Sequence, residues 1–407
     1  MNQLEKIFTM DKKNLVINLF PEYYQELVDL PWAQPLDQWN SKQIKFLEIR
    51  KGISKHTVRF IRTKNFSFAI KQTNPINAYF ENESLIKLLQ NGIHALRPVG
   101  YIIFKKNLFM KESDPDNALA FLITLLEEKS IPHSILFRWD FTEQNRKMIF
   151  EASSELLANL HFNNIFWGDA SLSNILVKFL KIKDENGRTF TELKAFLADA
   201  ETVSFLKNIS NEQRQNDVKN FINSIEEVNR NFVDKKTLNT LEDDKKYFLN
   251  SYSEHFSLLQ KTKQFEETTG LRIKNHFYRI TDKYSIDSII KQIEEHKWYL
   301  SEKASKEVDL KTAAKDWIKN IYEPTINEFN HLKLFDLFPK TNSLKLYVDI
   351  MAHKYYISLE QNKDAGISNA IKSYCEKYSN QEQSTITKLV DNLIKRLAKI
   401  FPQSYNL

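Results

Sequence analysis

The stretch HFNNIFWGDASLSNIL, residues 161–176, is the most informative part of the sequence. It contains Asp169 and, five positions later, Asn174, which leads into an apolar run over Asn174–Ile182 that predicts a strand. Phosphoryl transfer needs a group that orients or deprotonates the acceptor hydroxyl, ligands for Mg²⁺, and little covalent chemistry from the protein. One rigid loop with Asp169 facing the acceptor and Asn174 facing the metal would supply both. We therefore predict Asp169 as the catalytic residue and Asn174 as a metal ligand.

A second strand delivers two carboxylates downstream of this loop. A turn is expected at Asp184–Gly187, the residues Thr189–Leu197 predict a strand, and Asp199 and Glu201 follow directly after it. Carboxylate oxygens are hard ligands that suit Mg²⁺. We predict Asp199 and Glu201 as further metal ligands, although Glu201 fits equally well as a brace for its own loop.

The residues upstream of the quoted stretch predict a small sheet and a helix. Apolar and polar residues alternate over Val58–Ile70, with a turn at residues 63–65, which is typical of a half-buried hairpin. Apolar spacing predicts a helix over Glu81–Gln90. The apolar runs Val99–Phe104 and Leu119–Leu126 predict two more strands.

A nucleotide site is expected at the end of the hairpin. Lys71 closes its second strand and could reach nucleotide phosphates, while Glu83 on the following helix is expected to pair with it. The order of strand lysine, helix glutamate, Asp-x4-Asn loop and strand aspartate is typical of kinases. We expect the adenine to lie between Ala69 above and Leu176, or its neighbour Ile175, below.

The loop expected to cover the phosphates is Gly52-x-Ser54-x-His56. It has one glycine where the loop of protein kinases has three. Because backbone approach to phosphate normally uses glycine, Ser54 and His56 are expected to contact phosphate through their side chains.

These motifs together resemble the kinase-like superfamily, in particular its small-molecule branch of aminoglycoside and choline phosphotransferases and lipopolysaccharide-core sugar kinases. The resemblance rests on Leu160-His161 before Gly168-Asp169, on the Asp199-x-Glu201 motif, and on Asp217 in the place of an aspartate that braces the catalytic loop. It implies a two-lobed protein-kinase-like domain that uses ATP and Mg²⁺.

The chain also resembles an uncharacterised bacterial family described as a domain of unknown function. That likeness is carried by five motifs, namely Leu30-Pro31-Trp32 with Pro35, Leu36 and Trp39, residues 52–60, Trp167–Asn174, Asp199–Thr202 and His296–Glu302. The family has no settled function, so this likeness implies no particular activity.

Two departures from the kinase-like pattern favour an alternative function. Trp167 replaces the usual histidine before Gly168-Asp169, and the phosphate loop has a single glycine, Gly52. Both fit a pseudokinase that binds nucleotide as a regulatory module. A full set of polar site residues favours an active phosphotransferase instead.

The part of the chain beyond about residue 216 is predicted to be almost wholly helical and contains an internal repeat. Ile293–Trp317 aligns without gaps on Ile350–Tyr374, so that His296–Ser301 falls on His353–Ser358. Two helix–turn–helix units would bury a shared face. The paired histidines and aromatic residues indicate either a ligand site or, the reading we favour, an aromatic core with hydrogen-bonded histidines.

These patterns predict an α+β protein with four parts. They are an N-terminal extension at 1–40 with an extended, proline-rich connector, a kinase-like N-lobe at 41–128, a C-lobe at 129–238, and a helical domain at 239–407. One cysteine, Cys375, excludes an intrachain disulfide, and no apolar run is long enough to span a bilayer, so we expect a cytoplasmic protein.

The expected acceptor is a hydroxyl of a small molecule, glycan or lipid. Only residues 200–216 separate Asp199 from Asp217, and that interval contains no proline and no Ala-Pro-Glu anchor from which a peptide platform could be built. A net charge of +6 spread among acidic residues argues against nucleic acid as a partner. The acceptor's identity and the oligomeric state are left open by the sequence.

Overall fold

The computed structural model describes residues 8–12, 14–40, 44–49, 56–105, 118–139, 141–183, 189–232, 241–277, 282–331, 334–338, 341–363 and 365–378. Gly52 and Ser54 of the predicted phosphate loop lie outside these residues, as does the predicted turn at Asp184–Gly187.

The strands are β1 Phe8–Lys12, β2 Leu15–Leu19, β3 Lys45–Phe46, β4 Val58–Arg62, β5 Ser67–Thr73, β6 Pro98–Lys105, β7 Ala118–Leu125, β8 Ser130–Pro132, β9 Ile165–Phe166, β10 Ile175–Lys183, β11 Thr189–Leu197 and β12 Ser204–Phe205.

The helices are η1 Pro21–Tyr23, α1 Tyr24–Leu27, η2 Leu36–Gln38, α2 Pro75–Gln90, α3 His133–Leu136, α4 Glu143–Phe162, η4 Leu172–Asn174, α5 Asn211–Phe232, α6 Leu241–Thr269, α7 Ile273–His276, α8 Lys283–Ala304, α9 Leu310–Trp317, η6 Ile318–Tyr322, α10 Glu323–His331, α11 Leu334–Leu337, α12 Ser343–Gln361 and α13 Ile367–Tyr378.

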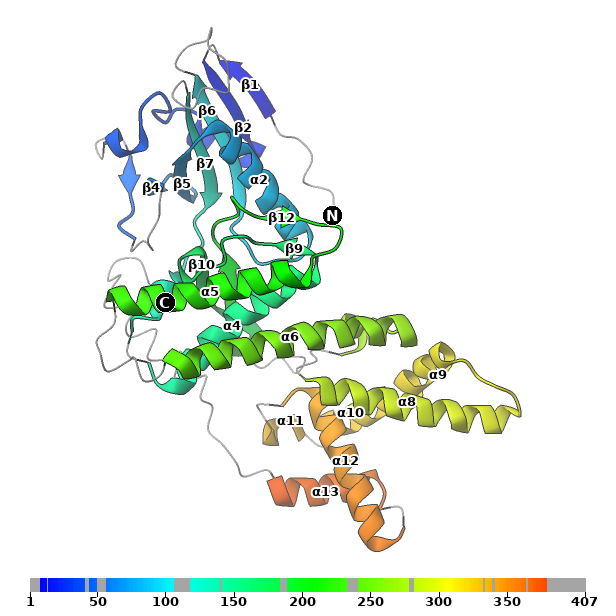
Figure 1. Ribbon diagram of the computed structural model, residues 1–407. Helices are drawn as coiled ribbons and strands as arrows, with labels where there is room; N and C mark the ends of the chain where they lie inside the picture. The colour runs from blue at the N-terminus through cyan, green and yellow to red at the C-terminus, as the bar shows by residue number, and fades with distance from the viewer. Residues whose placement is uncertain are drawn as a thin grey trace. The chain divides into compact units, whose positions relative to one another are not determined.

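A seven-stranded antiparallel sheet, in the order β1-β2-β6-β7-β5-β4-β3, forms the first part of the chain. The predicted hairpin is confirmed as β4–β5, and its turn is closed by the Thr63 N–H, which donates to the carbonyl of Phe66 at 2.9 Å. Helix α2 packs against β6 and β7 and runs along the sheet in Figure 1. The sheet and α2 therefore bring Lys71 and a helical glutamate to one place.

The N-terminal residues are part of this sheet, and the extended connector predicted within residues 1–40 is wrong. Strand β2 pairs with β6, and short helices replace the extended chain after residue 20. Trp32, Leu36 and Trp39 are buried in the core under the sheet, and Trp32 stacks edge-on to Trp39. The backbone at Pro35 and Trp39 is extended, with ψ of 145° and 131°, but these residues form part of a packed core segment and not a connector.

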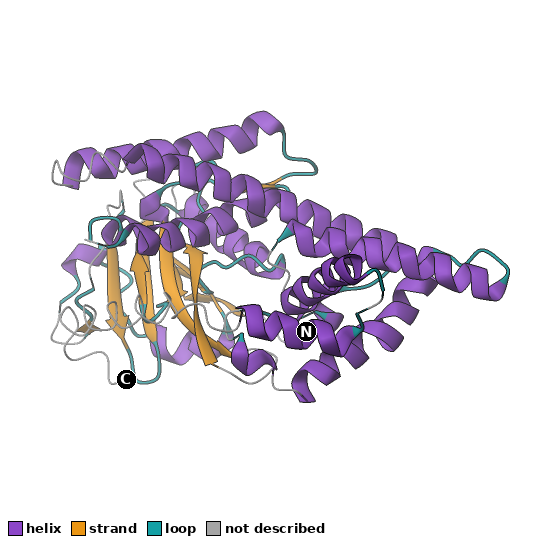
Figure 2. Ribbon diagram, turned by 90° about the horizontal axis from the view of Figure 1, so that it is seen from below, coloured by secondary structure: helices purple, strands orange, loops and turns teal. Residues whose placement is uncertain are grey.

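The residues that follow combine long helices with short strands. Helix α4 is buried around most of its circumference. Strands β8, β10 and β11 form a three-stranded sheet in which Thr189–Leu197 is a strand as predicted. A two-stranded sheet joins β9 to β12. Every described element after β12 is a helix. Figure 2 shows the helices in purple and the strands in orange. The predicted α+β class with a helical C-terminal region is confirmed.

The chain divides into two compact units, which are Met1–Phe179 with Leu193–Phe256, and Leu180–Glu192 with Ser257–Leu407. The four-part division proposed from the sequence stays a prediction. Among the described residues, no helix is both long and apolar enough to cross a bilayer.

The internal repeat is confirmed at the level of single hydrogen bonds. Helices α8 and α9 correspond to α12 and α13, and the residue that ends the first helix is left-handed in both copies, Ser305 with φ 51° and Asn362 with φ 50°. In each copy a serine hydroxyl donates to the carbonyl four residues earlier, Ser301 at 2.8 Å and Ser358 at 2.7 Å. The same hydroxyls accept the N–H groups of Val308 and Ala365.

The repeated histidines are hydrogen-bonded, but the aromatic residues beside them are not core. His296 bonds to Asp316 and His353 to Ser373, whereas the two aromatic pairs that follow the histidines are between 55% and 64% exposed. The core of this unit is formed by other residues, including Trp317, Tyr322 and Tyr347. The expected aromatic core at the repeated motif is therefore wrong, because these side chains lie on the outer side of each helix.

Candidate active site

Lys71 is the centre of a partly buried cluster of charges. Its Nζ donates to Glu81 Oε2 at 2.9 Å, to Asp199 Oδ2 at 3.0 Å and to Glu201 Oε2 at 3.4 Å. Burial alone would lower the pKa of Lys71, but the carboxylates of Glu81 and Asp199 outweigh it and raise that pKa above its usual value. The side chain therefore stays an ammonium group.

The glutamate that pairs with Lys71 is Glu81, and the predicted partner Glu83 is wrong. Glu81 lies on the buried face of α2 with Leu85 and Leu88, four and seven residues further along. Glu83 is rotated by about 200° from Glu81, because successive helical residues turn by about 100°. The apolar spacing of α2 was the signal that could have identified Glu81.

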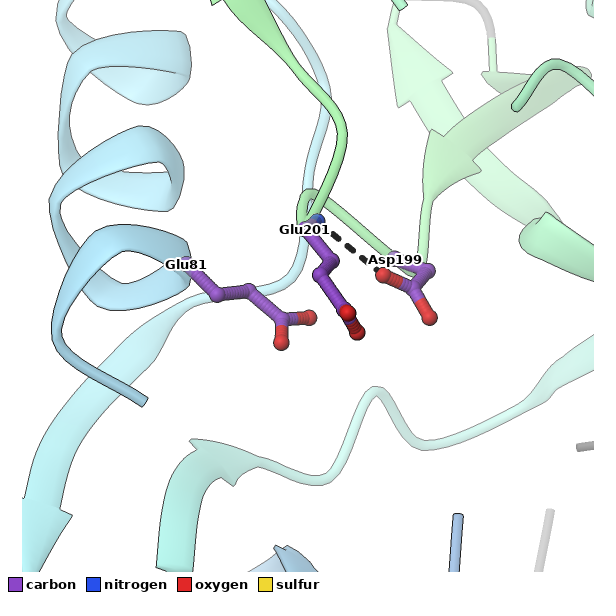
Figure 3. Close-up of side chains that lie close together, drawn as sticks. All are labelled: Glu81, Asp199 and Glu201. Atoms are coloured by element: carbon purple, nitrogen blue, oxygen red, sulfur yellow. Dashed lines mark hydrogen bonds between the residues drawn. The ribbon is translucent and has the colours of Figure 1, made fainter. Parts of the chain in front are cut away.

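Burial sets the protonation of Glu81. It raises the pKa of Glu81 to about 7, with repulsion from Asp199 adding to the rise and the ammonium of Lys71 opposing it. Figure 3 shows Glu81 reaching from α2 toward Asp199 and Glu201, which follow β11. One carboxylate oxygen from each of the three residues lies within 4.8 Å of the others.

Asp169 and Asn174 lie together in the loop between β9 and β10. Asn174 Nδ2 donates to the carbonyl of Asp169 at 3.0 Å and to its carboxylate at 3.2 Å. The N–H of Ala198 donates to the carbonyl of Asn174 at 2.9 Å, which fixes the loop beside Asp199. Asp169 itself is exposed. The structure therefore brings the Asp-x4-Asn pair next to the strand-end carboxylate.

Asp217 braces the start of this loop, as expected from its place in the sequence. It is fully buried, and its carboxylate accepts the N–H groups of Trp167 and Gly168, each at 2.8 Å. It also bonds to His161 Nε2 at 3.1 Å. Burial lowers the pKa of His161, so the neutral ring donates from Nε2 and accepts the hydroxyl of Tyr252 at Nδ1. His161 is thus a structural residue.

Trp167 contributes to the same bracing. Its side chain is fully buried, and its Nε1 donates to the carbonyl of Asp199 at 3.2 Å. Its own carbonyl accepts the Thr202 hydroxyl at 2.6 Å. The residue that departs from the kinase-like pattern therefore ties the loop between β9 and β10 to the Asp199 segment.

The remaining predicted nucleotide residues are placed as follows. His56 Nε2 lies 3.1 Å from Glu201 Oε2. Ala69 stands opposite Thr124 in the β5–β7 ladder. Leu176 is half-buried, whereas Ile175 is fully buried. Of the two residues considered for the lower side of the adenine, Leu176 is therefore the accessible one.

The donor set suits a hard divalent cation. Asp199 offers a partly exposed carboxylate, and Asn174, which uses its Nδ2 for Asp169, also has an amide oxygen that can ligate a metal. Sequence reasoning missed one residue of this site, Asn77 of α2, whose Nδ2 donates to Glu201 Oε1 at 2.6 Å. Its position four residues before Glu81 is the signal that points to it.

A family model described as a domain of unknown function, DUF4032, matches the chain twice, over residues 262–322 and 306–378. Both matches lie in the helical part that contains the repeat. The motifs at residues 30–202 that suggested such a family lie outside them. None of the curated proteins matches this chain.

Three solved structures show a similarity to the chain at low identity. WaaP in complex with acyl carrier protein is 13% identical, with 61% of this chain and 93% of that chain covered and a TM-score of 0.36. An aminoglycoside-3'-phosphotransferase of type VIII is 14% identical, with 52% and 86% covered and a TM-score of 0.35.

The third is the Rio2 kinase–ADP/Mg²⁺–phosphoaspartate complex from Chaetomium thermophilum, which is 12% identical, with 53% and 71% covered and a TM-score of 0.32. Because all three TM-scores are low, the fold and the site rest on this chain's own geometry.

Proposed function

We propose that the chain is an ATP- and Mg²⁺-dependent phosphotransferase that acts on a hydroxyl group. The observation that carries the proposal is the meeting of Lys71 with Glu81 and Asp199, which lies 128 residues further along the chain. A partly buried ammonium group held between two carboxylates, beside a loop with an exposed aspartate, fits the recurring parts of phosphoryl-transfer sites.

Each residue has a definite task in this reaction. Lys71, held by Glu81, binds the nucleotide phosphates, and Asp169 orients the acceptor hydroxyl and takes its proton as the oxygen attacks the γ-phosphorus. The bond from that phosphorus to the bridging oxygen breaks, and ADP leaves with the electron pair. Asp199 and Asn174 would hold Mg²⁺, which neutralises charge on the phosphates when bound. Ala69 and Leu176 would enclose the adenine. His56 would contact the phosphates through its side chain.

A small molecule, glycan or lipid fits the acceptor side better than a peptide. The segment between Asp199 and α5 is pinned down, since Leu206 N–H donates to the carbonyl of Asn164 and Ile209 N–H to its side-chain oxygen. Such a short, bound segment leaves little chain for a peptide platform.

Nucleotide binding is tested by thermal unfolding of the full chain. Mg²⁺-ATP at about one hundred times its Kd should stabilise the fold by about 2.7 kcal/mol, because a ligand that binds only the native state shifts the equilibrium. Lys71→Ala should abolish most of that shift, while Lys64→Ala, an exposed lysine of the same hairpin, should leave it unchanged. No shift with either Mg²⁺-ATP or Mg²⁺-GTP would refute the site.

Turnover is tested separately, against sugars, amino alcohols, lipids and a peptide library. Asp169→Asn should keep nucleotide binding and lose turnover by at least about a hundredfold, the usual scale of a lost general base. A wild-type protein that binds ATP but turns over no faster than Asp169→Asn would make the chain a pseudokinase. Efficient peptide phosphorylation that depends on Asp169 would overturn the assignment of the acceptor class.

A further inference from the structure

Glu201 is bound by side chains from three separate segments. Its Oε1 accepts Asn77 Nδ2 at 2.6 Å, and its Oε2 lies 3.1 Å from His56 Nε2 and 3.4 Å from Lys71 Nζ. Asn77 belongs to the first turn of α2, His56 precedes β4, and Lys71 is in β5. Both carboxylate oxygens are therefore engaged by protein donors.

One face of α2 holds the whole segment that follows β11. Asn77 and Glu81 are four residues apart and so lie one above the other on the helix. Asn77 binds Glu201, while Glu81 binds Lys71 and accepts the N–H of Ala200 at 3.4 Å. The start of α2 is itself fixed, because Asn74 caps it by accepting the Asn77 N–H at 2.8 Å.

The charges around Glu201 argue against a metal ion on its carboxylate. The ammonium group of Lys71 already lies within 3.4 Å of Glu81, Asp199 and Glu201. A divalent cation bound by Glu201 would have to displace the donors of Asn77 and His56. Asp199 accepts from one side-chain donor, Lys71 Nζ at 3.0 Å, and from the backbone N–H of Glu201 at 3.1 Å. A cation at Asp199 therefore competes with one side-chain donor, whereas at Glu201 it competes with three.

We propose that Glu201 and Asn77 form a positioning pair that fastens α2 to the Asp199 segment, and that Glu201 is not the second metal ligand. The pair keeps Glu81 against Lys71 while nucleotide and metal bind, and this consequence rests on the proposed function. Asn77 acts through Glu201 and needs no contact with substrate.

An isosteric exchange of the two side chains tests the pair. Asn77→Asp sets two carboxylates against each other, and Glu201→Gln removes the charge that His56 and Lys71 face. In the double variant, the carboxylate introduced at position 77 can accept a hydrogen bond from the amide introduced at position 201. The hydrogen bond is then restored with donor and acceptor exchanged, and the net charge of the pair is unchanged. Each single change should weaken Mg²⁺-ATP binding about tenfold, the scale of a lost hydrogen bond to a charged group. The double variant should recover to within about threefold.

A second readout does not depend on nucleotide. Hydrogen exchange of the first-turn amides of α2 should rise in both single variants of the ligand-free protein and return in the double variant. Gln90→Glu, an exposed change at the other end of α2, should alter neither readout.

The outcomes separate this inference from the proposed function. If wild-type protein ignores Mg²⁺-ATP while the exchange pattern is as expected, the function fails and the pair stands. If Glu201→Gln raises the Mg²⁺ concentration needed for ATP binding, leaves α2 exchange unchanged and is not rescued by Asn77→Asp, Glu201 is a metal ligand and the inference is wrong.

Discussion

Two helices in different units use a histidine to reach a later helix, and they do so in opposite environments. In the first unit, His161 of α4 and Asp217 of α5 are both fully buried. In the second unit, His296 of α8 is nearly buried, but its partner Asp316 has a side chain that is 36% exposed. In the repeated copy, Ser373 takes the place of Asp316 and bonds His353 at 2.9 Å.

The difference shows where an acceptor can be exchanged. Asp217 satisfies two backbone N–H groups as well as His161, so any replacement would leave buried donors without partners. Asp316 is half-exposed, so water can accept the hydrogen bonds of donors that a replacement residue no longer satisfies. The same histidine contact is therefore a fixed brace in the site-bearing unit and a variable detail in the repeat.

The largest effect is expected when the brace is broken. Asp217→Asn places an amide NH₂ against donors in a dry environment and should lower the free energy of unfolding by about 2–4 kcal/mol. Urea unfolding followed by circular dichroism and tryptophan fluorescence measures it, with the exposed Gln215→Ala on the same helix as control. A loss no greater than that of the control would mean that the loop is held by other contacts.

An intermediate effect should be equal in the two copies of the repeat. Ser301→Ala and Ser358→Ala each remove one donor and one acceptor at the end of the first helix, and each should cost about 1 kcal/mol. Their costs should agree within about 0.5 kcal/mol, because the contacts are the same. Urea unfolding compares them with Ser253→Ala, an exposed serine of α6. If the two variants lose clearly different free energies of unfolding, the two serines do not make equivalent contacts.

The smallest effect is a difference in pH dependence between the copies. The hydrogen bond from His296 lowers the pKa of Asp316 below its usual value, so this contact adds stability above about pH 4 that is lost as pH falls through the folded pKa. Asp316→Ser should remove that acid-dependent contribution, a few tenths of a kcal/mol for such an exposed pair. Melting temperatures measured from pH 7 to pH 3 test it, and an unchanged slope in the variant would contradict it.

Local patterns were enough to predict much of this protein from its sequence. Alternation of apolar residues gave the β4–β5 hairpin, the residues Thr189–Leu197 gave β11, and helical spacing gave the Glu81–Gln90 part of α2. The repeat could be detected because two segments of the chain, Ile293–Trp317 and Ile350–Tyr374, align without gaps. The Asp-x4-Asn loop was recognised from neighbouring residues alone, whereas the hydrogen bond from Asn174 to the Asp169 carboxylate was not predicted.

Contacts between distant residues were decided only by the tertiary structure. The choice of Glu81 over Glu83 depends on which face of α2 meets the sheet, and the two candidates differ only in rotation about the helix. The partners of Glu201 lie 124 and 145 residues away in the sequence. Likewise, Trp32 and Trp39 are buried in the core, which the local prolines did not indicate, because burial of large aromatic surface depends on residues distant in the sequence. Spacing along a chain fixes which residues share a face, whereas packing decides what that face meets.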